Sequence, residues 1–361
     1  MLELVFACFI GILIGTLTGM IPGIHVNTAG AILFASSAFL LGFLSPEFLC
    51  VLMVSMSIAH ALTEFVPSML LGVPQEGTAT SILPGHRMVL QGRSKEVIRI
   101  VAVGGFGAIV ITILMMPVFA VTLPFLHELT KPYTWIILLS ASVYLTYALT
   151  NSKRDFAWSL LLFLLSGILG WAIFQTPISS GVSLMCIFSG LFGISTILFS
   201  LNDNSEDDTV NFLLATSGLN ISDCLFSLMA IYIIGNPRSG IAVYMSYLIS
   251  DMSISHLVIF IFASLIAVSI SLILCLKLGD SFSKLMGGVD YRKLSIAVII
   301  LQIGILYIFT LYYKAPIFYM TLALITSTAL GMLPHYIGVG KSHLMGVLIV
   351  PAIVIYMQMF I

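Results

Sequence analysis

Long apolar runs alternate with short polar or Gly/Pro-containing segments along the whole chain. The apolar runs stop at residues 87–99, 124–132, 151–155, 202–208, 277–293 and 313–316. A helix of about 20 apolar residues is long enough to cross a bilayer. The pattern therefore predicts membrane-spanning helices at roughly 98–122, 133–150, 156–174, 181–201, 254–276 and 294–313.

Composition restricts the class of protein further. Hydrophobic residues make up 60% of the 361 residues and charged residues only 8%, whereas soluble domains carry about 25% charged residues. The mean hydropathy is +1.15, and a soluble fold would expose apolar patches that monomeric proteins avoid. The net charge of −1 offers no basic surface for nucleic acid.

The apolar runs are continuous, which favours helices over the alternating strands of a β-barrel. We therefore expect an all-α polytopic membrane protein with roughly ten transmembrane helices in the cytoplasmic membrane. Most basic residues lie in the segments 87–99, 153–154 and 277–293. The positive-inside rule predicts that these loops face the cytoplasm.

Two stretches of the sequence share one pattern and predict an internal duplication. Residues 72–79 and 235–242 both read G-x-P-x-x-G-x-A. A hydroxyl residue followed by an acid precedes each copy, and a serine follows each acid by four residues: Thr63-Glu64 with Ser68, and Ser222-Asp223 with Ser227. We expect two pseudo-symmetric, inverted halves: residues 1–201, with broken segments near 15–28 and 64–85, and residues 209–361, with a broken segment near 223–242.

Glycine and proline within these regions predict re-entrant or broken helical hairpins. The sites are Pro22-Gly23, Gly72-Val73-Pro74, Pro84-Gly85 and Gly235-Asn236-Pro237. Lipid cannot satisfy free amides, so a break at membrane depth must lie inside protein or against a water-filled cavity. The N-terminus of the following half-helix is a local positive end suited to an anion. Such breaks at matching places in two halves indicate the midplane site of a secondary transporter.

Charged residues near the breaks are candidates for function, because a charge at bilayer depth is costly and usually pairs or lines a pathway. Glu64, Glu76, Asp223 and Arg238 are of this kind. Simpler interpretations stay open for some of the polar residues. Glu64 can pair locally with His60 one helical turn earlier, Arg238 can reach lipid headgroups, and His25 can cap the next half-helix.

Catalytic chemistry has little support in the sequence. His60 and Glu64 are spaced H-x-x-x-E rather than the H-E-x-x-H of zinc proteases, and no G-x-S-x-G nucleophile motif occurs. The cysteines, Cys8, Cys50, Cys186, Cys224 and Cys275, are scattered and form no CxxC pair. We expect no enzyme activity, no metal centre and no cofactor, except for Na⁺ as a possible coupling ion.

Several motifs resemble the large integral-membrane subunit of the tripartite tricarboxylate transporters, in its compact archaeal form. Residues 15–23 (GTLTGMIPG) are similar to the family's G-x-x-x-G-x-x-P-G opening, and residues 70–74 with 78–80 to its LLGIPG segment. Residues 84–93 resemble its D-G-Y-P turn, and residues 190–195 (GLFGIS) its GLFAIS motif. The chain departs from the family at Gln75-Glu76 and at Pro84.

The resemblance implies an organic-anion permease with two inverted halves and substrate held between re-entrant tips. It also implies possible partners, since bacterial members work with a small membrane subunit and an extracytoplasmic binding protein. The leading hypothesis is a secondary transporter for a di- or tricarboxylate. The alternative is a flippase for a polyprenyl-phosphate lipid, which would use similar hairpins and an arginine on the phosphate.

In the leading hypothesis, carboxylates of the substrate meet the half-helix N-termini and Arg238. The substrate-binding candidates are Thr18, Gly23, His25, Asn27, Thr28, Gly72, Pro74, Gln75, Gly77, Thr78, Thr80, Asn236, Arg238 and Ser239. The candidates for ion coupling are Glu64, Glu76 and Asp223. They would carry a coupling proton or contribute oxygens to Na⁺, and the sequence leaves this choice open.

Overall fold

The molecule is built from two compact units, and each unit takes one segment from each half of the sequence. The computed structural model describes residues 2–21, 24, 26–72, 78, 81–150, 152–178, 180–195, 198, 209–235, 237, 239–286 and 291–360. Unit 1 contains Met1–Pro124 and Glu206–Leu294, and unit 2 contains Phe125–Ser205 and Ser295–Ile361. Helices are the only regular elements among the described residues, which confirms the all-α expectation.

Eight helical stretches of the described chain are long and apolar enough to cross a membrane. They confirm a polytopic membrane protein. Shorter apolar helices occur at Val26–Ala35, Val182–Ile194 and Ile299–Tyr312. Ser94–Ala148 is a single candidate stretch of 55 residues, although the sequence predicts two separate spans there. A 3₁₀ turn rather than an open loop joins the two parts, because Pro132 fits the first turn of a helix.

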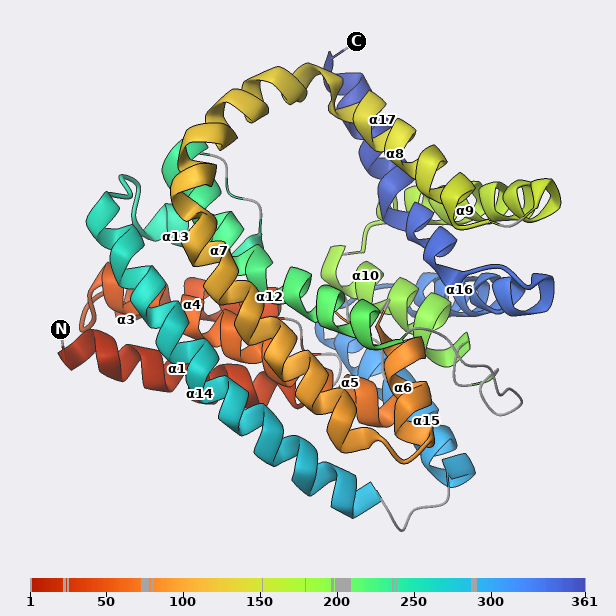
Figure 1. Cartoon of the computed structure of the whole chain (residues 1–361), viewed down its shortest axis with the longest axis horizontal. Coiled ribbons are helices and arrows are strands. Elements are labelled where there is room, and N and C mark those ends of the chain that lie inside the picture. Colours follow the sequence, from red (N-terminus) through yellow and green to blue (C-terminus); the bar gives the residue numbers. More distant parts are fainter. Residues whose placement is uncertain are drawn as a thin grey trace. The chain divides into compact units, whose positions relative to one another are not determined.

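Unit 1 holds most of the candidate site (Figure 1). Its helices are α1 (Leu2–Gly19), α2 (Val26–Ala35), α3 (Ser37–Leu40), α4 (Pro46–Thr63), α5 (Phe65–Leu71), α6 (Ile82–Leu90), most of α7 (Ser94–Thr130), α12 (Thr209–Ile234), α13 (Gly240–Leu248) and α14 (Ile254–Met286). The centre of the unit is α4, which is buried along nearly its whole length. Helices α1, α2, α12, α13 and α14 all pack against it.

Glycines allow α1 to lie close against α4. A Cβ on Gly11 would collide with the Leu52 carbonyl, and one on Gly15 with the Met56 carbonyl. Small residues spaced four apart permit such close approach of helices in lipid, where van der Waals packing replaces the hydrophobic effect. This contact places the last turn of α1 beside the C-terminal end of α4.

Helices of the second half repeat the order of the first. Pro46–Leu71 and α12 each end at a glycine of positive φ: Gly72 at 69° and Gly235 at 64°. After each break comes a helix of nine residues, α6 or α13, and then a long helix, α7 with 37 residues or α14 with 33. Both breaks predicted at these glycines are therefore present.

One predicted interruption, at Pro84-Gly85, is wrong. Helix α6 runs through both residues, and the Gly85 amide donates to the Ser81 carbonyl at 3.0 Å. Pro84 lies in the first turn of α6, where a backbone N–H has no partner within the helix. The proline therefore starts this helix rather than breaking it.

Unit 2 contains η1 (Lys131–Tyr133), α8 (Thr134–Ala148), α9 (Lys153–Phe174), α10 (Ser180–Phe188), η2 (Ser189–Ile194), most of α15 (Tyr291–Tyr312), α16 (Ile317–Ile337), η3 (Lys341–Met345) and α17 (Gly346–Phe360). Glycines again allow close packing, since a Cβ on Gly170 would collide with the Val347 carbonyl of α17. The GLFGIS motif forms the π-helical turn η2. Lys341 Nζ donates to Ser195 Oγ at its end, at 2.8 Å.

Candidate functional site

Glu64 stands where the helical stretch Pro46–Leu71 changes from α4 to α5. It is the C-cap residue of α4 and the N-cap residue of α5. Pro67 follows three residues later. A proline inside a helix supplies no N–H to the carbonyl four residues before it, which here is that of Thr63. The sequence thus places a discontinuity directly beside a buried carboxylate, since Glu64 is only 4% exposed.

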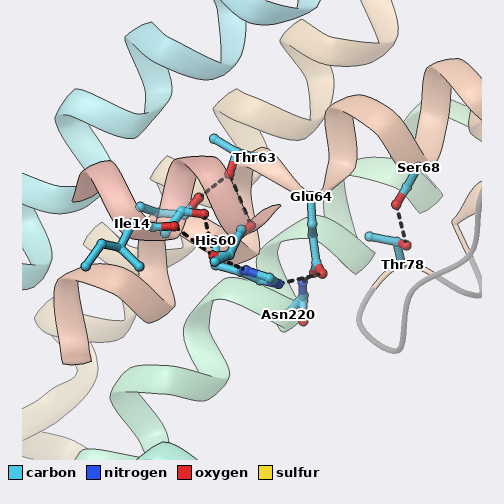
Figure 2. A network of polar contacts seen from close by, with 10 residues as sticks. Ile14, His60, Thr63, Glu64, Ser68, Thr78 and Asn220 are labelled. Atoms are coloured by element: carbon cyan, nitrogen blue, oxygen red, sulfur yellow. Dashed lines mark hydrogen bonds and ion pairs between the residues drawn. The ribbon is translucent and has the colours of Figure 1, made fainter. Parts of the chain in front are cut away.

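Three helices contribute polar groups around this carboxylate (Figure 2). Asn220 Nδ2 on α12 donates to Glu64 Oε1 at 2.6 Å. His60 Nε2, one turn earlier on α4, lies 3.6 Å from Glu64 Oε2. On its other side His60 Nδ1 lies 2.9 Å from Thr18 Oγ1 in the last turn of α1. Thr18, His60, Glu64 and Asn220 therefore form one connected cluster, which we call the Glu64 cluster.

The segment after Gly72 is tied to the same helix. Thr78 Oγ1 donates to Ser68 Oγ at 3.0 Å, and both side chains are buried. Ser68 lies one helical turn after Glu64, as Figure 2 shows. His86 of α6 donates from Nδ1 to the Met69 carbonyl at 2.8 Å, because a carbonyl can only accept. The break thus folds back onto α5.

Helix α12 also holds the far end of this break. Ser81 Oγ, directly before α6, donates to Thr216 Oγ1 at 2.6 Å. Thr216 and Asn220 are four residues apart and therefore neighbours on one face of α12. The hydrogen bonds Ser81–Thr216 and Asn220–Glu64 therefore both connect the first half of the sequence with the second.

The second break is capped differently. Ser239 Oγ accepts from the Ala242 amide at 3.2 Å, which satisfies one free amide at the N-terminus of α13. Asn27 Oδ1, on α2, accepts from the Ile241 amide at 3.3 Å. Phe34 and Tyr244 stack at 5.1 Å between the same two helices. Two of the amides predicted to face an anion therefore have protein acceptors.

The structure places the predicted residues in two groups. Thr18, Glu64, Gly72 and Thr78 lie in or beside the Glu64 cluster and the first break, whereas Asn27 and Ser239 meet at the N-terminus of α13. Thr28 follows Asn27 on α2, and Asp223 is exposed on α12. The predicted residues that lie outside the described part of the chain are Gly23, His25, Pro74, Gln75, Glu76, Gly77, Thr80, Asn236 and Arg238.

Asn220, Ser81 and Thr216 are site residues that the sequence did not single out as partners. Thr216 and Asn220 could have been found as a polar pair at helical spacing within an apolar run. The local pairing of His60 with Glu64, open at the sequence level, is present at 3.6 Å. The five cysteines are free.

Comparison with known proteins agrees with the motifs. The chain matches the family described as "Tripartite tricarboxylate transporter TctA family" over residues 5–211 and 202–346. It is 26% identical to an uncharacterized protein of Methanocaldococcus jannaschii over 99% of this chain and 100% of that protein. An uncharacterized 52.8 kDa protein in the TAR-I ttuC' 3' region of Agrobacterium vitis is 23% identical over 55% of this chain and 41% of its own length. No solved structure is significantly similar to the chain.

Proposed function

Because this chain belongs to the tripartite tricarboxylate transporter TctA family, we propose that it is a secondary transporter for a small organic anion with two or three carboxylates. Transport across the cytoplasmic membrane is coupled to H⁺ or Na⁺. The chain itself is a multi-pass membrane protein. In this proposal it also binds a small membrane subunit and an extracytoplasmic binding protein, the other two parts that the family's tripartite architecture implies.

The observation that carries the proposal is the pair of matched broken segments in unit 1. Each combines a long helical stretch, a left-handed glycine, a break and a nine-residue helix. Broken helices at corresponding places in two halves are typical of transporter sites at the bilayer midplane. The order of the units along the chain, with each half contributing first to unit 1 and then to unit 2, supports an internal duplication.

We propose that the substrate binds between the two breaks. Its carboxylates contact the candidates of the first break from Gly72 to Thr80 and those of the second break around Arg238. At the second break, one amide at the N-terminus of α13, that of Ile241, already donates to Asn27 Oδ1. An anion therefore displaces the Asn27 side chain or binds beside it, and Arg238 supplies the charge.

A thermal-shift screen of the purified protein tests this proposal. Citrate, other di- and tricarboxylates and a polyprenyl phosphate are added singly, with and without Na⁺. A ligand at about 100 times its Kd stabilises the folded state by about 2.7 kcal/mol, which a thermal shift detects. Stabilisation by carboxylates and not by the lipid supports the transporter, whereas the reverse result favours the flippase.

The variant Arg238→Ala sharpens the screen. If Arg238 is a buried partner of a substrate carboxylate, we expect its loss to weaken binding by about 2–5 kcal/mol. Citrate binding measured by calorimetry gives this number directly. Arg93→Ala is a matched control, since Arg93 is an exposed arginine that pairs with Glu96 at 2.7 Å. Equal affinity of the Arg238 variant and wild type would remove Arg238 from the site.

A further inference from the structure

His60 and Glu64 form a buried acid–base pair at the α4–α5 junction, and we propose that this pair binds the coupling proton. The proposal rests on the proposed transport function and selects H⁺ over Na⁺ as the ion. His60 is 1% exposed and Glu64 4%. The argument depends on which atoms face the carboxylate, on the total charge of the pair and on its position beside the first break.

Nitrogen atoms rather than oxygens face the Glu64 carboxylate. Asn220 Nδ2 donates to Oε1 at 2.6 Å, and His60 Nε2 lies 3.6 Å from Oε2. Hard cations bind sets of oxygen ligands, so a Na⁺ ion at Glu64 would have to displace both neighbours. A proton needs no such displacement.

The hydrogen bonds of His60 prepare Nε2 to share a proton with Glu64. Thr18 Oγ1 lies 2.9 Å from both the Ile14 carbonyl oxygen and His60 Nδ1. When the hydroxyl donates to that carbonyl, Nδ1 donates to Thr18, and the neutral ring presents the lone pair of Nε2 to Glu64. His60 Nε2 is buried and has no hydrogen bond in the described structure. One proton held between Nε2 and Oε2 completes the contact.

The charge of the pair then couples the proton to an anion. With one shared proton the pair is neutral in total, with none it is −1, and with two it is +1. Burial makes a net charge on the pair costly unless a nearby opposite charge compensates it. A second proton binds when a negative substrate compensates it, and by linkage the proton raises the affinity for the anion by the same factor.

The pair lies within one turn of the segment proposed to bind the anion. Ser68 follows Glu64 by four residues on α5, and its hydroxyl accepts from Thr78 in the first break at 3.0 Å. Figure 2 shows the Ser68–Thr78 contact next to Glu64. In this proposal an anion held near Thr78 therefore lies close to the pair that carries the proton.

Other ionisable groups lie on the elements packed against α4 and α5, or on these helices themselves. They are Glu3 and Cys8 on α1, Glu47 and Cys50 on α4, His86 and Arg87 on α6, Asp223, Cys224 and Tyr232 on α12, Tyr244 and Tyr247 on α13, and His256, Cys275, Lys277, Asp280 and Lys284 on α14. Within the described structure the side-chain contacts of Glu64 are those with His60 and Asn220. The proton therefore belongs to this pair.

Uptake into proteoliposomes tests the choice of ion. The purified full chain is reconstituted, and uptake of radiolabelled citrate and succinate is measured with either an inward H⁺ gradient in Na⁺-free buffer or an inward Na⁺ gradient at equal pH. With one proton per anion, one pH unit supports about tenfold accumulation. We expect the H⁺ gradient to drive uptake without Na⁺. Uptake driven only by Na⁺ would overturn the inference and leave the proposed function intact.

Variants assign the proton to the pair. We expect His60→Gln and Glu64→Gln to lose H⁺-driven accumulation and to keep exchange of external for internal substrate, which needs no net proton movement and shows that the variants fold. His256→Gln and Glu47→Gln are matched controls. That pair has the same chemistry and a similar separation, 3.7 Å, but is partly exposed. Loss of coupling in the controls, or its retention in both His60 and Glu64 variants, contradicts the assignment.

A second measurement needs no substrate. An infrared pH titration of the purified protein detects protonation of a buried carboxyl group. We expect a carboxyl band that disappears in Glu64→Gln, shifts along the pH axis in His60→Gln and is unchanged when NaCl replaces KCl. Absence of such a band, or its displacement by Na⁺, would overturn the inference. If wild type transports and binds no carboxylate of the panel, the proposed function fails instead.

Discussion

The two breaks of unit 1 both follow a long helical stretch that ends at a left-handed glycine, but the residues before them differ. Before the first break the carboxylate of Glu64 is buried and held by Asn220 and His60. Before the second break the matching acid, Asp223, is exposed. The first break is tied to α5 through Thr78 and to α12 through Ser81. At the second break, Ser239 and Asn27 of α2 accept amides at the start of α13.

The two copies therefore share backbone features but differ in the contacts of their side chains. Both breaks require a left-handed glycine and a short following helix, so both copies keep them. A buried charge is costly unless it is hydrogen-bonded, and at the first break Asn220 gives the buried Glu64 carboxylate such a bond. We infer that ion chemistry belongs to the first copy and that the second copy mainly positions α13.

Removing the two acids gives the largest expected contrast. Glu64→Ala leaves Asn220 and His60 without their buried partner, and we expect it to lower the free energy of unfolding by about 3 kcal/mol or more. Asp223 is exposed, so Asp223→Ala leaves less buried polar surface unpaired, and we expect a smaller loss than for Glu64→Ala. Denaturation in detergent measures both. Equal losses of unfolding free energy in the two variants would show that the two acids contribute equally to stability and that the copies do not differ in this respect.

Alanine at the two left-handed glycines is the next contrast. A residue with a Cβ pays about 1–2 kcal/mol in this conformation. A Cβ on Gly72 would also lie 3.2 Å from His86 Nε2, while one on Gly235 would meet open space. We expect Gly72→Ala to cost about 2 kcal/mol or more and Gly235→Ala about 1 kcal/mol.

Asparagine tolerates the left-handed region better than other residues with a side chain. Gly235→Asn should therefore recover most of the stability that Gly235→Ala loses. Gly72→Asn should not recover it, because the contact with His86 remains. Recovery at both positions would show that His86 does not restrict the first break.

The sequence predicted the fold class, the helix ends at Gly72 and Gly235 and the membrane character, because these depend on local signals: long apolar runs and glycine–proline clusters. The break predicted at Pro22-Gly23 lies outside the described residues. The sequence misjudged Pro84, since a proline breaks or begins a helix depending on its place in the turn. The predicted spans at 98–122 and 133–150 match two helices, α7 and α8, which the 3₁₀ turn η1 joins.

The side-chain contacts of the site were harder to predict. The pairing of His60 with Glu64 follows from their spacing on one helix, and the sequence allowed it. The bond from Asn220 to Glu64 joins residues 156 positions apart, and no local pattern encodes such a contact. The repeat relates Asp223 to Glu64 by position in the sequence. The residue of α12 that contacts the Glu64 carboxylate is Asn220, three residues before Asp223, because the packing of α12 on α4 selects that position.

Gly240 offers a test of the contact that holds the second break. A Cβ there would lie 2.7 Å from Asn27 Oδ1, the acceptor of the Ile241 amide. We expect Gly240→Ala to cost about 1.5 kcal/mol through overpacking and loss of that bond. In the Asn27→Ala background the same substitution should cost clearly less, because the two residues share one contact. Full additivity in this double-mutant cycle would show that Asn27 does not hold α13.

The serines that precede the two nine-residue helices give the smallest effect. Ser239 caps α13, and we expect Ser239→Ala to cost about 1 kcal/mol, with Ser239→Asp neutral because aspartate also caps. Ser81 caps nothing: its backbone is helical and its hydroxyl bonds to Thr216. Ser81→Ala should therefore cost about 0.5–1 kcal/mol and show coupling to Thr216→Val. Aspartate at position 81 should not restore stability, because Ser81 does not cap. Rescue by aspartate at both positions would mean that both serines cap the helix that follows. The two copies would then differ only in the burial of Glu64 and Asp223.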